Sequence, residues 1–293
     1  MFAFCTDPGT LPQWQWFACY LTSGTHLAFY WSFVVVMILL ALAAPAALLM
    51  GLGAALAMRA RFAPLRWLGQ GYTAIVRGVP DIVFFLFVPI AVGQGIEALL
   101  HQVRCPHWDM PIWQGNDFIV CPEARVPPRG SPSWVRDLYG FSLAVLAFAL
   151  VFGAFVGNTL SGAMRAVPRA QMETAEAYGM TRGQAMRRVL LPQMWIYALP
   201  GLSNIWMILI KATPLLFLLG IQDAVFWARE LGGAKTSLYK YPHPDWRVWY
   251  FLGLLVFYLF LTWGSERIFG RLTERLSRGQ ATAAGERMRK AAA

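Results

Sequence analysis

The chain has 293 residues, of which 57% are hydrophobic and only 14% are charged. Soluble domains carry about 25% charged residues, so this composition, with a mean hydropathy of +0.47, excludes an ordinary soluble protein and indicates a membrane protein. The formal net charge of +10 could also indicate nucleic-acid binding. The arginines cluster beside hydrophobic segments, however, as they do at the cytoplasmic ends of membrane helices, which favours a membrane orientation signal.

The first predicted span is a helix over residues 27–58. This segment contains no charged residue and is longer than the about 20 residues that a span needs, so it predicts a tilted helix with overhang. Arg59, Arg61 and Arg66 follow directly. They place this end of the helix in the cytoplasm and the preceding segment, residues 1–26, outside.

The second predicted span covers residues 72–98. Its charge-free part, Ile82–Ile96, is too short to cross a bilayer, so the span is extended backward and takes in Arg77, which can snorkel. A polar loop follows over residues 99–137. Its many prolines and balanced charges are typical of the outer side, and its length favours a functional role.

Three further charge-poor segments predict spans that complete a bundle within residues 27–270. They cover residues 138–164, 192–220 and 246–266. The charged segment 165–191 and the basic tail 271–293 are then cytoplasmic, so all arginine-rich segments fall on one side. The sequence therefore predicts an all-α integral membrane bundle of five transmembrane helices, with the N-terminus outside and the C-terminus in the cytoplasm.

The four cysteines fall on the predicted outer side or at its border. An oxidising compartment permits disulfides, and Cys105 with Cys121, within one loop, is the natural pair. A link between Cys5 and Cys19 and four free thiols both stay open. The chain has no C-x-x-C pair and no clustered histidines, so no metal site is expected.

The charged segment after the third span predicts two short helices joined at a glycine. Residues 171–178 are strong helix formers, and Gly179 can end that helix in a left-handed conformation. Thr181 can begin a second helix, which ends or kinks at Pro192. From these residues alone, the element could either bind a partner protein or lie on the membrane surface as an amphipathic connector.

Within this segment, Glu173-Thr174-Ala175, Gly179 and Val189-x-Leu191-Pro192 resemble the EAA loop of bacterial ABC importer permeases, written E-A-A-x3-G-x9-I-x-L-P. The spacing matches throughout. Thr174 replaces the middle alanine, and Val189 replaces isoleucine conservatively. We call residues 173–192 the EAA-like segment.

Two further segments are similar to the polar amino-acid subfamily, whose members carry histidine, lysine, arginine, ornithine and opines. Residues 71–81 (GYTAIVRGVPD) are similar to its Y-x3-(I/V)-R-G-x-P signature, and residues 191–204 (LPQMWIYALPGLSN) are also similar. Arg77, Gly78 and Pro80 are expected to form a structural turn. The loop over residues 101–137 looks like an insertion relative to the short family form.

The resemblance implies the permease subunit of an ATP-binding-cassette importer in the bacterial inner membrane. Such a subunit forms the pore for a polar amino acid or similar small solute delivered by a periplasmic binding protein, and it pairs with a second permease and with ABC ATPase subunits. The chain has no G-x4-G-K-[ST] phosphate loop, so ATP and Mg are expected on the ATPase and no catalytic residue here. The residues implied in coupling to the ATPase are Glu173, Ala175, Glu176, Gly179, Arg182, Leu191 and Pro192.

Polar residues inside the predicted spans are candidates for the substrate path, although Ser and Thr also join helices to one another. They are Asn158, Thr159, Ser161, Asn204, Lys211 and Thr213. Asn158 stands where the family commonly has glutamate, and Ala212 where it commonly has aspartate. These departures leave open that a partner permease carries the main substrate site.

Two other functional classes remain as alternatives. One is a membrane assembly protein without transport activity, which would only borrow the helix–glycine–helix segment. The other is a secondary transporter, which is disfavoured because no inverted repeat is visible in the sequence. The long outer loop is interpreted as a docking surface for the binding protein.

Overall fold

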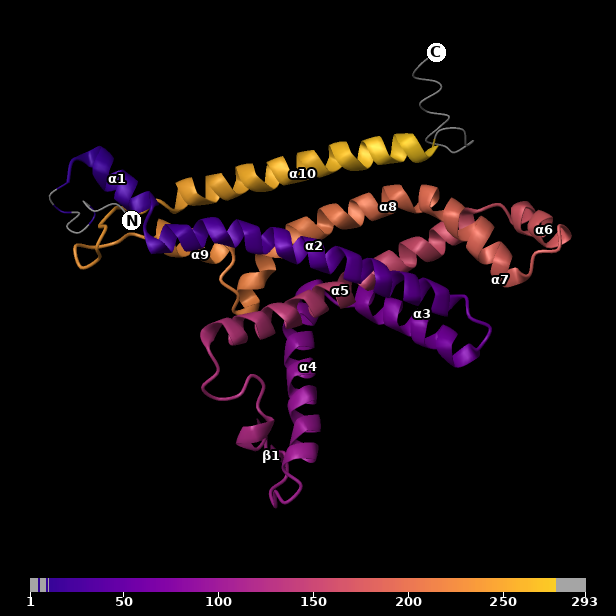
Figure 1. Ribbon diagram of the computed structural model, residues 1–293, viewed down its shortest axis with the longest axis horizontal. Helices are drawn as coiled ribbons and strands as arrows, with labels where there is room; N and C mark the ends of the chain where they lie inside the picture. The colour runs from indigo at the N-terminus through magenta and orange to yellow at the C-terminus, as the bar shows by residue number, and fades with distance from the viewer. Residues whose placement is uncertain (1–4, 6–8, 10, 278–293) are drawn as a thin grey trace, which may run out of the picture. The chain divides into compact units, whose positions relative to one another are not determined.

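The computed structural model describes Cys5, Gly9 and residues 11–277 of the chain. Helices dominate the described residues (Figure 1). They are α1 (Gln13–Leu21), α2 (Gly24–Met58), α3 (Ala63–Gly78), α4 (Asp81–Arg104), α5 (Ser133–Ala166), α6 (Arg169–Ala177), α7 (Arg182–Ala185), α8 (Leu191–Ala212), α9 (Ala224–Gly232) and α10 (Arg247–Ser277). The shorter elements are β1 (Trp113–Gln114), β2 (Asp117–Phe118), the 3-10 helices η3 (Pro122–Ala124) and η5 (Thr213–Leu219), and the π-helical turn η4 (Met186–Leu190).

Five helical stretches of the described chain are long and apolar enough to cross a membrane. They are Gly24–Met58, Asp81–Arg104, Ser133–Ala166, Arg182–Leu219 and Arg247–Leu276. Each corresponds to one of the five predicted spans, so the prediction of an all-α bundle of five transmembrane helices is confirmed.

The second span begins later than the predicted residue 72. The chain forms a separate helix, α3, up to Gly78, and α4 starts only at Asp81. Pro80 has no N–H to donate and disfavours a helical conformation for Val79, which explains the break. Arg77 therefore belongs to α3 and not to the second long helix.

The loop before the third span and the tail after the fifth are both shorter than predicted. Since α4 extends to Arg104 and α5 begins at Ser133, the predicted loop 99–137 is reduced to residues 105–132. Towards the C-terminus, α10 runs to Ser277, into the predicted tail. Residues 278–293 lie outside the described residues.

Residue contacts divide the chain into two compact units, which we describe separately. The first comprises Met1–Ala43, Val79–Phe148 and Thr213–Val256, and the second comprises Ala44–Gly78, Ala149–Ala212 and Phe257–Ala293.

Small residues hold α2 and α5 close together in the second unit. A Cβ on Gly157 of α5 would lie 3.0 Å from Cβ of Ala54 of α2 and 3.2 Å from the carbonyl oxygen of Gly51. Close approach at small residues is the usual way in which membrane helices associate. Helix α3 lies beside the C-terminal half of α2 (Figure 1). It also contacts α5, because the Tyr72 hydroxyl of α3 donates to the carbonyl oxygen of Leu150 of α5 at 2.5 Å.

In the first unit, α1 forms a cap that is held by a disulfide and by tyrosine hydrogen bonds. Cys5 is bonded to Cys19, next to the buried side chain of Tyr20. The Tyr20 hydroxyl lies 3.1 Å from Nε2 of His243 and 3.0 Å from the hydroxyl of Tyr250. These bonds join α1 to the start of α10 and to the loop before it.

The loop over residues 105–132 is folded onto the end of α4. Cys105 is bonded to Cys121, with the two Cα atoms 6.7 Å apart. The backbone N–H of Cys121 donates to Nδ1 of His101 at 3.1 Å, and that of Val126 donates to Oε1 of Glu97 at 3.0 Å. Strands β1 and β2 form a two-stranded antiparallel hairpin between the cysteines. The loop is thus a small ordered module, which we call the 105–132 module.

The disulfide of this module joins two residues that could otherwise help to bind a metal ion. The possible ligand atoms of His101, Cys105 and Cys121 lie within 4.8 Å of one another, which would suit a metal ion if both sulfurs were thiolates. Because the two sulfurs are bonded to each other, the thiolates that a metal needs are absent from this cluster.

Removing the module's disulfide is expected to loosen it locally. The Cys105→Ser/Cys121→Ser variant loses a link across a sequence separation of 16, worth about 3 kcal/mol for a loop of this length. Limited trypsin digestion should therefore cleave at Arg125 and Arg129 earlier than in the parent. The Cys5→Ser/Cys19→Ser variant is the matched control and should leave cleavage at these sites unchanged. Equal cleavage rates in the parent and in the first variant would contradict the expectation.

Candidate functional site

The EAA-like segment begins with a short helix that a left-handed glycine ends. Gly179, with φ of +81°, follows α6 and its C-cap Tyr178. The Gly179 N–H donates to the carbonyl oxygen of Glu176 at 2.9 Å, and the Met180 N–H donates to that of Ala175 at 3.1 Å. This pair of bonds is a Schellman motif, so the glycine at the centre of the segment fixes where the chain reverses.

A capping box starts the second helix. The Gln184 N–H donates to Oγ1 of Thr181 at 3.4 Å, and the Thr181 N–H donates to Oε1 of Gln184 at 2.9 Å, as in the S/T-x-x-E/Q pattern. Helix α7 then widens into the π-helical turn η4 and continues as α8. Pro192, which has no N–H, lies at the second position of α8, directly after this irregular turn.

The two short helices bury small side chains and expose charged ones. Ala175 of α6, at 5% exposure, and Ala185 of α7, at 0%, are buried, and α6 contacts both α7 and η4. Glu173, Glu176 and Arg182 are exposed. The segment therefore presents a polar surface on a rigid, internally packed support.

Tyr178 is the most accessible large side chain of this surface, with 84% of it exposed. Its exposure leaves it free for a partner. Leu191 is half-buried and Pro192 is exposed, so the two last residues of the EAA-like segment differ in environment.

One face of α8 is exposed along its length and carries two of the predicted path residues. Asn204, Ile208 and Lys211 are all exposed, and their spacing of four and three residues puts them on one face of the helix. Lys211 forms no ion pair with any residue of the described chain.

Lys211 lies level with the middle of the charge-free part of α5, at the edge of the second unit. A Cβ at Gly201 of α8 would lie 2.5 Å from Cγ2 of Thr159 of α5, so these positions face each other. Helices α5 and α8 run antiparallel, and each rises about 1.5 Å per residue. Lys211, ten residues after Gly201 in α8, is therefore level with Ala149, ten residues before Thr159 in α5. The charge-free part of α5 covers residues 138–164, so this level is close to its centre. A lone ammonium group at such a depth is costly in lipid.

The other predicted path residues lie in different surroundings. Ser161 and Thr213 are buried, Thr159 faces Gly201, and Asn158 is half-buried. Two of the predicted path residues therefore lie on an exposed face of α8, and the other four are buried or half-buried.

The predicted structural turn Arg77-Gly78-x-Pro80 forms the break between α3 and α4. Arg77 lies in the last turn of α3 and is exposed, where a cation interacts favourably with the helix C-terminus. Gly78 is the last residue of α3, and Pro80 precedes the first residue of α4 with an extended ψ of 133°. The turn thus redirects the chain between two helices.

Sequence reasoning did not single out Asp223, which caps α9 from a buried position. Its Oδ1 accepts the N–H of Phe226 at 2.8 Å, while Oδ2 is buried without a hydrogen-bond partner in the described chain. Burial raises the pKa of Asp223 to about 6. The backbone hydrogen bond from Phe226 lowers this pKa, but its effect is smaller than that of burial. An Asp directly before an apolar helical run is a recognisable N-cap signal, but its burial depends on tertiary packing.

Replacing Asp223 with asparagine is expected to change how stability depends on pH. Because the folded pKa of about 6 exceeds the unfolded value of about 3.9, the folded parent binds more protons between these pH values. Its free energy of unfolding should therefore fall by about 2 kcal/mol as pH rises through that window, and stay level above it. The asparagine side chain keeps the cap and should remove this fall in thermal unfolding followed from pH 4 to 8.

The matched control for that experiment is Asp245→Asn. Asp245 also accepts a backbone N–H near a helix start, that of Arg247 at 3.0 Å, but its side chain is exposed. This control should keep the pH dependence of the parent. A parent whose stability stays level from pH 4 to pH 6, or an Asp223→Asn variant with the parent's slope, would contradict the assignment.

Comparison with known proteins finds a matching family and several similar proteins. Residues 47–278 match the family described as "Binding-protein-dependent transport system inner membrane component". The chain is 32% identical over 213 residues to the histidine/lysine/arginine/ornithine transport system permease protein HisQ of Salmonella typhimurium, covering 72% of this chain and 76% of that protein. It is 28% identical over 222 residues to the arginine ABC transporter permease protein ArtQ of Escherichia coli, covering 75% and 82%.

Two further relatives extend the comparison. The nopaline transport system permease protein NocQ of Agrobacterium fabrum is 28% identical over 225 residues, covering 77% of this chain and 80% of that protein. The fold is similar to that in a crystal structure of an amino acid ABC transporter with histidines, with a TM-score of 0.58 and 22% identity over 85% of this chain and 94% of that one. By the family match and by its identity to HisQ, the chain belongs to the inner membrane components of binding-protein-dependent transport systems.

Proposed function

We propose that this chain is the permease subunit of an ATP-binding-cassette importer that forms the pore for a polar amino acid or a similar small solute. The observation that carries the proposal is the EAA-like segment. It presents Glu173, Glu176 and Arg182 on two short helices, the second of which is continuous with a candidate membrane span. Support for the solute class comes from the relatives, which are named as permeases for basic amino acids and for nopaline.

The proposed partners follow from the chemistry that the chain lacks. The sequence has no phosphate loop, so ATP and Mg would bind to ABC ATPase subunits whose surface receives α6 and α7. A second permease subunit, identical or not, would complete the pore, and a periplasmic binding protein would deliver the solute. The chain itself carries no catalytic residue in this account.

The proposed orientation in the inner membrane places the N-terminus outside and the C-terminus in the cytoplasm. Arg59, Arg61 and Arg66 follow the first span, and the EAA-like segment carries arginines between the third and fourth spans. Such clusters mark the cytoplasmic side. The 105–132 module, with its disulfide, then lies in the oxidising periplasm.

The proposed solute path runs along the exposed face of α8. Asn204 and Lys211 lie on this face, and Lys211 supplies a cation at mid-membrane depth that can attract a carboxylate. A second candidate role is that of a partner permease that does not itself hold the solute. That role is favoured by Asn158, which replaces the family's common glutamate.

The 105–132 module is proposed as an additional docking surface for the binding protein. It carries an ordered hairpin on which Trp113 is 58% exposed, and exposed tryptophans are common anchors in protein interfaces. In Trp113→Ala, half-maximal stimulation of ATP turnover should therefore need about tenfold more binding protein. Basal ATP turnover should stay unchanged. Trp134→Ala, which removes an exposed tryptophan outside the module, is the control. Unchanged stimulation would count against this docking role.

Co-purification tests the proposed function. A tagged chain expressed with its candidate ATPase should bring that subunit down, and Glu173→Lys should abolish the interaction by reversing a charge on the surface of α6. Asp109→Lys reverses an exposed charge outside the EAA-like segment and should leave the interaction intact. If neither the parent nor the control retains an ATPase, the importer proposal fails and a membrane assembly role is favoured.

A further inference from the structure

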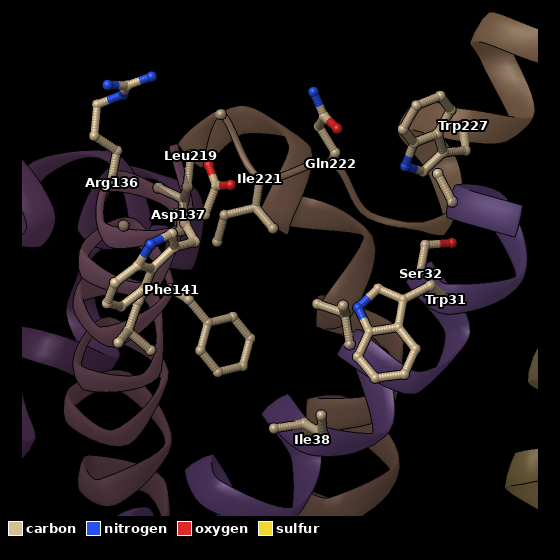
Figure 2. Close-up of a pocket in the computed structure, with 16 residues that line it drawn as sticks. Trp31, Ser32, Ile38, Arg136, Asp137, Phe141, Leu219, Ile221, Gln222 and Trp227 are labelled. Atoms are coloured by element: carbon tan, nitrogen blue, oxygen red, sulfur yellow. The ribbon is translucent and has the colours of Figure 1, made fainter. Parts of the chain in front are cut away.

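A cavity of about 600 Å³ lies in the first unit, outside the features described above (Figure 2). Its walls come from the first part of α2, the first part of α5 and the chain from the end of η5 into α9. On α2 the lining residues are Ala28, Trp31, Ser32, Val35 and Ile38, whose spacing puts them on one face of the helix. They extend over ten residues, so the cavity runs for about 15 Å along α2.

The two ends of the cavity differ in polarity. Arg136, Asp137 and Gln222 line one end, and Ile38 and Phe141 line the other. Figure 2 shows Arg136 and Gln222 at the same end of the view, with open space between the rings of Phe141 and Trp31 further along the helices. The polar end is the one that adjoins the 105–132 module, where α5 begins, so polarity falls with depth into the span.

Three tryptophans surround this cavity. Trp31 and Trp134 are 61% and 65% exposed, and Trp227 of α9 also lines the cavity. Tryptophans gather at the level of lipid head groups because one end of the ring system is apolar and the other can donate a hydrogen bond. Trp134, two residues before Arg136, and Trp227, near Gln222 in Figure 2, indicate that the polar end of the cavity lies at the membrane–water interface.

The charges at the polar end complement a zwitterionic head group. Nη1 of Arg136 donates to the carbonyl oxygen of Ser131 at 2.6 Å, which leaves other N–H groups of its guanidinium for a phosphate. Arg136 and Asp137 form no ion pair within the described chain. The Asp137 carboxylate, one residue further on, can accept hydrogen bonds from an ammonium group.

We propose that this cavity binds a phospholipid whose head group carries both a phosphate and an ammonium group, as phosphatidylethanolamine does. The phosphate contacts Arg136, the ammonium contacts Asp137, and part of an acyl chain lies along Val35, Ile38 and Phe141. A polar amino acid would match the charged end but leave the apolar end unfilled. The leaflet is the one on the side of the 105–132 module, which is the outer leaflet in the orientation proposed above.

Native mass spectrometry of the full-length chain, purified in mild detergent with the subunits that accompany it, tests the proposal. The parent should retain a phospholipid. Arg136→Ala should retain it about tenfold less well, since hydrogen bonds to a charged group are lost. Ile38→Trp fills the apolar end and should have a similar effect. Arg129→Ala and Val34→Trp are the controls, because both residues lie outside the lining and Val34 is as exposed as Ile38, at 40%.

Adding back lipid or free phosphate separates the possible occupants. Adding phosphatidylethanolamine to the delipidated parent should restore the lipid-bound species in the mass spectrum. Millimolar inorganic phosphate should not displace this lipid. Equal retention in Ile38→Trp and Val34→Trp would overturn the proposal, as would displacement of the lipid by inorganic phosphate. Loss of a second permease subunit in Ile38→Trp, with no lipid bound to the parent, would instead assign the cavity to a subunit interface and would also overturn it.

Discussion

Replacing Gly179 with valine is expected to abolish ATP-driven uptake while the membrane bundle stays folded. Gly179 has φ of +81°, a conformation that costs a residue with a Cβ about 1–2 kcal/mol and a β-branched one more. The cost falls on the Schellman motif that sets the angle between α6 and α7. Because these helices would transmit the motion of the ATPase, a displaced α6 should uncouple ATP turnover from transport.

The matched control is Gly53→Val. Gly53 lies in α2, outside the EAA-like segment, is exposed, and has open space where a Cβ would be added, without a positive φ. Uptake, ATPase co-purification and thermal unfolding should be measured on both variants. The control should transport like the parent, and Gly179→Val should unfold near the parent's temperature but transport nothing. Parent-like uptake by Gly179→Val would show that the geometry of this turn is not needed for coupling.

Replacing Lys211 with methionine is expected to lower uptake by about tenfold or more. The side chain is exposed on α8 at mid-membrane depth, and we have proposed that it attracts the carboxylate of the solute. Loss of a hydrogen bond to a charged group costs about 1.5–3 kcal/mol, which corresponds to about tenfold or more. Methionine keeps a similar length and adds no charge, so the bundle should remain folded and the ATPase should still co-purify.

Two further variants define the role of that lysine. Lys211→Arg keeps the charge and should retain part of the uptake. Lys235→Met removes a lysine that pairs with Glu230 at 2.7 Å outside the spans and should leave uptake unchanged. Lys211→Met could instead lower the amount of a second permease that co-purifies, while the complexes that do form take up solute normally. That result would show that Lys211 serves subunit pairing, and it would contradict the assignment of Lys211 to the solute path.

The five spans could be predicted because charge is absent from long segments and arginines follow them. The bounds of the second span could not be predicted in the same way. The hydrophobic pattern continues across Pro80, and only the local backbone, with α3 ending at Gly78 and α4 starting at Asp81, shows two helices. The order within the 105–132 module was also missed, because its hydrogen bonds join residues that lie about twenty or more positions apart in the chain.

The turn of the EAA-like segment could be predicted from local chemistry. A glycine after a run of helix formers predicts a left-handed cap, and Thr181 predicts the next helix start; the structure has both. The environment of Thr159 could not be predicted, since it depends on the register between α5 and α8. The burial of Asp223 and the cavity beside α2 likewise depend on segments that are distant in sequence.

The most direct test of the central claim is solute accumulation in proteoliposomes that contain this chain, its ATPase and any second permease. We expect that a basic or other polar amino acid accumulates only when ATP reaches the ATPase side and the binding protein is present on the other side. We also expect that Gly179→Val abolishes this accumulation. Accumulation that is driven by an ion gradient without ATP, or that is unaffected by Gly179→Val, would contradict the account.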